Sequence, residues 1–65
     1  VPGSLQVLDM RTALLRLYGA RETLCYEYLC ETDDGQRCVI AVNARSGQQE
    51  RIRILDALDS VQPQF

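Results

Sequence analysis

The chain of 65 residues contains no histidine, no tryptophan and no lysine. Without histidine it lacks the base that activates the nucleophile in Cys-His catalysis. A zinc site is disfavoured too, because the chain offers neither histidine nor a C-x2-C pair as ligands. We therefore expect no enzymatic activity, no catalytic residue, no metal and no cofactor. The alternative in this class is an enzyme fragment whose active site is completed by other segments.

Long apolar runs and excess positive charge are also missing. No run approaches the ~20 apolar residues that span a bilayer, so we expect membrane contact only through segments outside this chain. The formal net charge is −2, and all seven basic residues are arginine. Phosphate binding needs a clustered positive excess, and we therefore expect no nucleic-acid partner.

The residues that are present fit one small folded domain. The hydrophobic fraction of 46% argues against disorder. A domain this short has a thin core, and such cores are often helped by a disulfide or a partner chain. We expect leader or junction residues at 1–4, the domain at 5–55 and a polar tail or linker at 56–65, all taken from a longer protein.

Residues 4–18 show a helical pattern. Four apolar residues recur at helical spacing, namely Val7, Met10, Leu14 and Leu17. Gly19 stands where a left-handed residue would end such a helix. Residues 4–10 could also be extended, and the sequence leaves that choice open.

Further along, the apolar residues alternate with a period of two, which predicts strands at 24–31, 37–43 and 49–55. Asp33-Asp34-Gly35 and Arg45-Ser46-Gly47 stand between them. Each segment fits a three-residue hairpin loop that ends in a left-handed glycine. The sequence therefore predicts an antiparallel β-meander.

These loops set a register in which Cys30 faces Cys38 and Val42 faces Glu50. A slip of one residue in the pairing would turn the apolar side chains of neighbouring strands to opposite faces of the sheet. The predicted register instead gathers them on one face. The members of this face are Tyr26, Tyr28, Cys30, Cys38, Ile40, Val42, Ile52 and Ile54. The predicted fold class is therefore α+β, with the N-terminal helix packed on that face of a three-stranded antiparallel meander.

The second hairpin resembles a known family. The run Val42-Asn43-Ala44-Arg45-Ser46-Gly47 is similar to the valine-aspartate-alanine-basic-threonine-glycine turn of PepSY domains. Asn43 replaces the aspartate and Ser46 the threonine, and both keep the turn chemistry. The resemblance covers roughly residues 4–55, although the turn is its specific part.

PepSY-like domains occur in propeptides of secreted metallopeptidases, in spore-germination proteins and in membrane-anchored envelope proteins. The resemblance implies a non-catalytic protein-binding or regulatory module of a secreted or membrane-anchored bacterial protein, located outside the cell or in its envelope. A peptidase that it inhibits or regulates is one candidate partner, and a neighbouring domain is another. The alternative is a structural accessory or dimerisation domain of a larger envelope protein, which forms a homodimer.

The cysteines leave two interpretations open. Cys30 and Cys38, being directly opposed, are close enough for a disulfide, which needs the oxidising compartment that the resemblance implies. The other interpretation is a pair of buried free thiols, the usual state of unpaired cysteine. Cys25 lies on the other face and would stay unpaired.

The opposite sheet face is a candidate partner-binding surface. Its apolar members Leu29 and Val39 are unusual for a solvated face, and its basic members suit an acidic partner: Arg37, Arg51 and Arg53. The strand at 49–55 is a candidate edge for strand addition by a partner.

Overall fold

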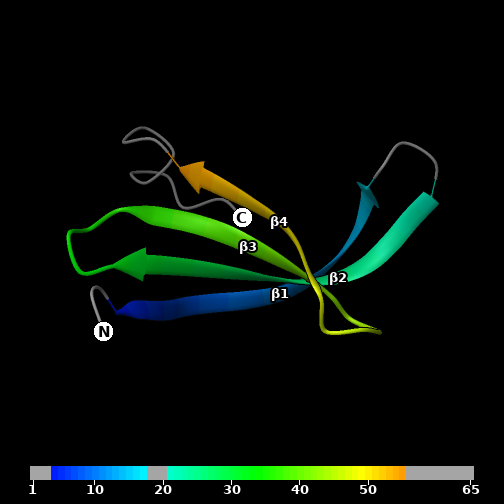
Figure 1. Cartoon of the computed structure of the whole chain (residues 1–65), viewed down its shortest axis with the longest axis horizontal. Coiled ribbons are helices and arrows are strands. Elements are labelled where there is room, and N and C mark those ends of the chain that lie inside the picture. Colours follow the sequence, from blue (N-terminus) through cyan, green and yellow to red (C-terminus); the bar gives the residue numbers. More distant parts are fainter. Residues whose placement is uncertain (1–3, 18–20, 56–65) are drawn as a thin grey trace.

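The computed structural model describes residues 4–17 and 21–55, which form one antiparallel sheet (Figure 1). Its four strands are β1 (Leu5–Leu17), β2 (Arg21–Thr32), β3 (Arg37–Asn43) and β4 (Gln49–Leu55). Each strand pairs with its neighbour in sequence, so the sheet order is β1-β2-β3-β4. The described residues contain no helix and hence none that could cross a membrane.

The predicted N-terminal helix is therefore wrong, and the fold is all-β instead of α+β. Leu5–Leu17 forms a strand of 13 residues that pairs with β2 from Leu5–Thr32 to Leu17–Arg21. Its leucines, alanine and arginines favour a helix locally. Pairing with β2 satisfies the backbone groups along one edge of that strand, and this tertiary contact overrides the local preference.

A β-bulge in β1 explains the helical appearance of its sequence. The register shifts between Val7 and Asp9, so Leu8 is an extra residue without a partner in β2. An extra residue restarts the alternation of side chains. Val7 and Met10 thus face the same side although they are three residues apart. This spacing imitates one helical step.

The first predicted turn is confirmed. The N–H of Thr32 donates to the carbonyl of Gln36 at 2.8 Å, and the N–H of Gly35 donates to the carbonyl of Thr32 at 3.0 Å. Gly35 has a φ of 86°, the left-handed conformation that closes a three-residue loop. The predicted pair Cys30–Cys38 follows in the ladder.

The second turn is longer than predicted. Asn43 donates to the carbonyl of Gln48 at 2.8 Å and accepts from Gly47 at 2.8 Å, so Ala44 also belongs to the loop. Val42 consequently pairs with Gln49, and the predicted pairing with Glu50 is wrong. A register shift beside Val42 then restores the predicted pairs Ile40–Ile52 and Cys38–Ile54.

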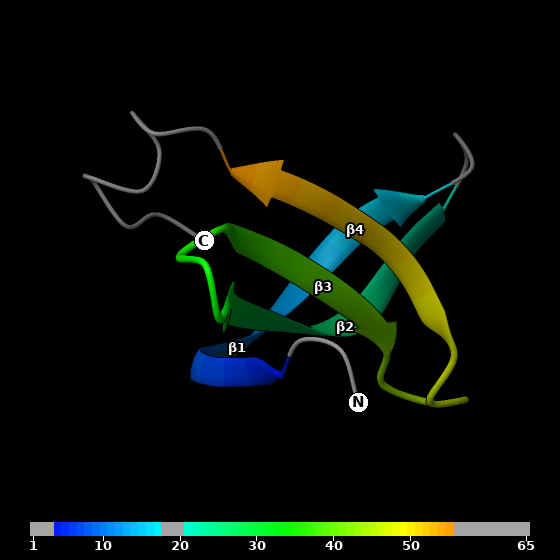
Figure 2. The ribbon, with the colours of Figure 1, turned by 60° about the vertical axis from the view of Figure 1, so that its left-hand side comes forward.

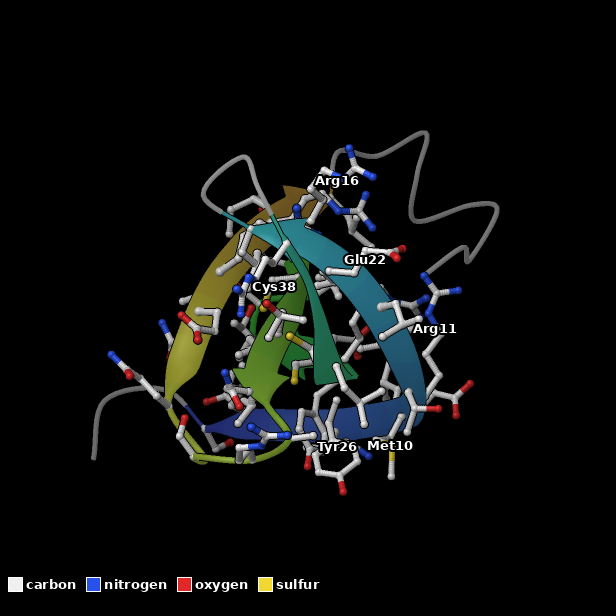
Figure 3. The ribbon with its side chains drawn as sticks, turned by 90° about the vertical axis from the view of Figure 1, so that its right-hand side faces the viewer. Met10, Arg11, Arg16, Glu22, Tyr26 and Cys38 are labelled. Carbon is white, nitrogen blue, oxygen red and sulfur yellow. The ribbon has the colours of Figure 1, made fainter. Side chains whose placement is uncertain are left out.

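The sheet is strongly curled, and one face forms most of its interior (Figure 3). The β1–β2 hairpin extends beyond the end of β3 and diverges from β3 and β4 in Figure 1, whereas in the turned view of Figure 2 it crosses behind β4. Leu29, Val39 and Leu55 form the core cluster, with exposures of 5%, 3% and 1%. Cys25 and Ala41 are buried on the same face.

The face predicted to form the core is instead largely open. Only Cys30 and Cys38 of its predicted members are buried, whereas Ile52 is 49% and Ile54 is 63% exposed. The reason is that the N-terminal segment joins the sheet as β1 and therefore cannot cover this face.

Candidate binding surfaces

An open apolar face extends across all four strands. One row of paired residues runs from Met10 through Tyr28 and Ile40 to Ile52. A second row runs from Val7 through the two opposed cysteines to Ile54. We define the open apolar face by its most exposed members, which are Leu5, Val7, Met10, Leu14, Leu24, Ile52 and Ile54.

This face is large for so small a protein. Its seven members have exposures between 49% and 63%. A fully exposed side chain of this size presents about 200 Å², so together they leave on the order of 700 Å² open to water. The largest apolar patch on a typical monomer measures roughly 300–600 Å² and is often functional. Met10 and Tyr26 point outward from the curled sheet in Figure 3.

The inner face carries a buried charge. Glu27 is 2% exposed, and its Oε1 accepts from the Nε of Arg11 at 2.8 Å. The Nη2 of Arg51 lies 3.9 Å from its Oε2. Arg11, Glu27, Ala41 and Arg51 form one row across the sheet, because each is paired with the next. The two arginines cover the carboxylate and compensate its charge.

The predicted partner-binding face is thus the inner face. Leu29 and Val39 lie in the core cluster, which explains their apolar character without a partner. Arg37 forms an ion pair with Glu31 at 2.8 Å, as the register requires. Arg53 is exposed, and binding of a partner to the arginines of this face stays a prediction.

The cysteines are described as free thiols, and all three are buried. The Sγ of Cys30 donates to the carbonyl of Tyr28 at 3.7 Å. Burial raises the pKa of Cys30, and the neighbouring Cys38 raises it further. Burial also raises the pKa of Cys25, helped by the charges of Glu50 and Glu27. The disulfide between Cys30 and Cys38 stays a prediction, for which the confirmed register supplies the required proximity.

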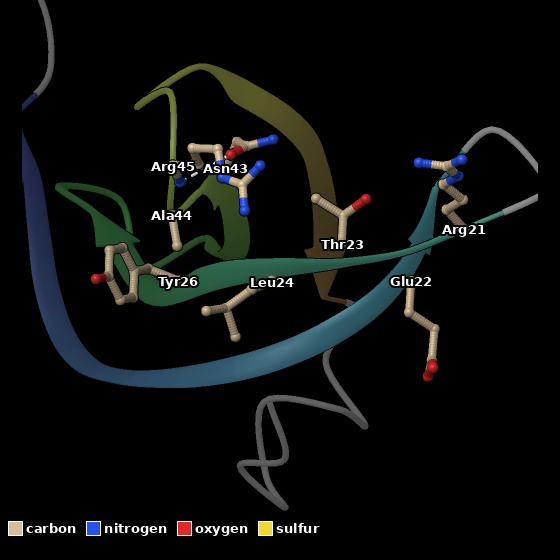
Figure 4. A pocket seen from close by; sticks show the side chains of 8 residues that line it. All are labelled: Arg21, Glu22, Thr23, Leu24, Tyr26, Asn43, Ala44 and Arg45. Atoms are coloured by element: carbon tan, nitrogen blue, oxygen red, sulfur yellow. Dashed lines mark hydrogen bonds between the residues drawn. The ribbon is translucent and has the colours of Figure 1, made fainter.

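A cavity of about 620 Å³ opens where β2 runs past the end of β3 (Figure 4). It lies between the first residues of β2 and the turn after β3, and its walls are formed by Arg21, Glu22, Thr23, Leu24, Tyr26, Asn43, Ala44 and Arg45. Sequence reasoning missed this site, because a strand predicted to begin at Leu24 has no free edge before that residue.

Within the described ranges 4–17 and 21–55, no cluster of three or more cysteine or carboxylate side chains could hold a metal ion. The described residues present three surfaces: one apolar face, one charged face and one cavity at a strand edge. No protein-family model, no curated protein and no solved structure matches this chain.

Proposed function

We propose that the chain is a non-catalytic protein-binding module that packs its open apolar face against another protein. The observation that carries this proposal is the exposure of seven large apolar side chains on one side of the sheet. Burying such surface gains roughly 25 cal/mol per Å² before the costs of association. A partner that covers this face also completes the second layer that a single sheet lacks.

The PepSY resemblance supports a regulatory role for this module. The specific part of the resemblance is the turn between β3 and β4. In this turn Asn43 Oδ1 accepts hydrogen bonds from the N–H groups of Arg45 and Ser46. The N-terminal helix predicted from the spacing of the apolar residues is replaced by β1, so the likeness now rests on the hairpin. In this proposal the module regulates a peptidase or another protein of the bacterial cell envelope.

The test uses immobilised protein and bacterial cell-envelope extract. The variant Met10→Lys/Ile52→Lys places two charges on the open apolar face, and Gln48→Lys serves as the matched control in an exposed turn. We expect one or more proteins to be retained by the wild type and the control but not by the face variant. Circular dichroism verifies that all three proteins are folded. Equal retention by the face variant, or no retention by folded wild type, contradicts the proposal.

A second candidate function is dimerisation, which the size of the face favours. A standard interface buries about 800 Å² per partner, close to the ~700 Å² that this face leaves open. Two copies packed face to face would form a β-sandwich. Sedimentation equilibrium decides this alternative: a wild-type dimer that Met10→Lys/Ile52→Lys converts to a monomer supports it, and a wild-type monomer rejects it.

A further inference from the structure

We propose that the cavity beside β2 binds an extended acidic segment of another polypeptide, which adds as a short strand to the free edge at Arg21–Leu24. This site shares Leu24 with the open apolar face. The groups that carry the proposal, which are the edge at Glu22 and the side chains of Arg21 and Arg45, lie outside that face. Four observations carry the proposal, namely the free edge, the direction of its backbone groups, the cavity, and two arginines that form no ion pair with a carboxylate of the described residues.

The free edge arises from unequal strand lengths. β2 has 12 residues, and it pairs with β1 as far as Arg21. Its pairing with β3 begins only at Cys25. Within the described part of the chain, Arg21–Leu24 therefore has a strand on one side alone. An unpaired strand edge is a template for an additional strand.

The backbone groups on this edge point into the free space. The carbonyl of Leu24 accepts from the N–H of Ala44 at 3.0 Å, which shows that Leu24 directs its groups toward the β3 side. Alternate residues of a strand direct their groups to the same side. The N–H and C=O of Glu22 consequently point the same way, and the N–H of Leu24 joins them. The N–H and C=O of Glu22 can form one closely spaced pair of hydrogen bonds with a residue of an added strand.

The charges around the cavity select an acidic ligand. Arg21 and Thr23 extend from one side of β2, the side on which Arg45 lies, whereas Glu22 extends from the other side (Figure 4). Arg21 and Arg45 are exposed, and no carboxylate of the described residues forms an ion pair with either. A carboxylate between the two guanidinium groups would gain charge-assisted hydrogen bonds.

The register then fixes where the acidic residues of the ligand must stand. The ligand residue opposite Glu22 has its side chain on the side of Glu22, where a carboxylate is repelled. Its two neighbours in the ligand extend to the other side, toward Arg21 and Arg45. The preferred segment therefore carries an acidic residue on each side of a non-acidic one.

The test measures the fluorescence anisotropy of a labelled short peptide with glutamates at alternate positions and threonine between them. We expect binding that Arg21→Ser/Arg45→Ser weakens by about tenfold or more. Arg16→Ser is the matched control, because Arg16 lies on β1 opposite Glu22 and on the face away from the cavity arginines. A peptide with lysines in place of the glutamates should not bind.

Strand addition itself has a separate readout. Methylation of the peptide nitrogen that faces Glu22 removes one ladder hydrogen bond and should weaken binding without changing charge. Met10→Lys/Ile52→Lys should leave binding intact, which separates this site from the open apolar face. The proposal is overturned if the glutamate peptide does not bind, if the methylated peptide binds equally well, or if Arg16→Ser is as damaging as the double variant.

Discussion

At the scale of single residues, Glu27 is the group with the most demanding environment. Its carboxylate is removed from water at 2% exposure, and a buried charge is costly unless it is paired. The pairing comes from the sheet, since Arg11 on β1 and Arg51 on β4 reach it along one row. The register thus stabilises the charge, and the charge in turn disfavours other registers.

We expect Arg11→Ala to lower the free energy of unfolding by about 1–3 kcal/mol. Glu27 would then keep the longer contact with Arg51, at 3.9 Å, in a site closed to water. Arg16→Ala is the control, because Arg16 is exposed on the same strand and should cost less than about 0.5 kcal/mol. Urea unfolding measures both variants, and equal costs would contradict the role given to Arg11.

The carboxyl of Asp33 provides a pH-dependent prediction. The hydroxyl and N–H of Ser4 donate to it at 2.6 and 3.1 Å, and these hydrogen bonds hold the pKa of Asp33 below its usual range. A lowered pKa in the folded state means that the contact stabilises the fold above the unfolded pKa of about 4. The contribution is lost as the pH falls through the lowered pKa of Asp33.

NMR titration of the side-chain carboxyls tests this assignment. Ser4→Ala should return the pKa of Asp33 toward its ordinary value and should leave that of Asp34 low. The pKa of Asp34 is lowered by the hydroxyl of Thr32 and the N–H of Gln36, so it does not depend on Ser4. A change in Asp34 of the same size as that in Asp33 would rule out a specific Ser4 contact.

At the scale of elements, the two turns show how far local chemistry determines the sheet. Gly35 and Gly47 have φ values of 86° and 76°, a conformation that costs other L-residues roughly 1–2 kcal/mol. The predicted positions of these glycines fixed the pairing of β2 with β3. The second loop is one residue longer than predicted. A register shift beside Val42 compensates for the extra residue, and this shift depends on contacts along the ladder between β3 and β4.

We expect Gly47→Ala to lower the free energy of unfolding by about 1 kcal/mol. No atom lies within 4 Å of the position that the added Cβ would occupy, so the cost comes from the backbone alone. Gly47→Asn should cost less, since asparagine tolerates the left-handed region better. Thermal unfolding of both variants measures the difference, and an alanine variant as stable as the wild type would exclude a strained turn.

The cysteine pair between β2 and β3 gives another prediction at this scale. With three buried thiols of which two have raised pKa values, the folded protein should react slowly with a thiol reagent at neutral pH. Unfolding without reductant should then expose three reactive thiols. A count of one thiol would instead demonstrate the disulfide between Cys30 and Cys38.

At the scale of the whole molecule, the curl of the sheet decides which face is the interior. Ile54 and Leu55 are neighbours in β4, yet they are 63% and 1% exposed. A sheet without a second layer buries mainly the face toward which it curls. On its other face the two small cysteines Cys30 and Cys38 are buried, whereas the large apolar side chains at its edges stay available for a partner. This geometry underlies both the proposed function and its alternative.

The neighbours Ile54 and Leu55 test the assignment of the two faces. Leu55→Ala should lower the free energy of unfolding by about 2–5 kcal/mol, because it leaves a cavity in the core cluster. Ile54→Lys should change it by less than about 0.5 kcal/mol in dilute protein. Urea unfolding of the two variants gives the answer. The opposite order of costs would mean that the face of Ile54 is the true core.

The sequence by itself determined the β-meander from β2 to β4 and the Cys30–Cys38 register. These features depend on turn residues and on alternation, which act over a few neighbouring positions. Only the tertiary structure decided the state of Leu5–Leu17 and the side on which the core lies. The bulge at Leu8 interrupts the alternation of apolar side chains in β1, so the sequence of this segment resembles a helix. The side on which the core lies follows from the direction of curl, which depends on all the strands together.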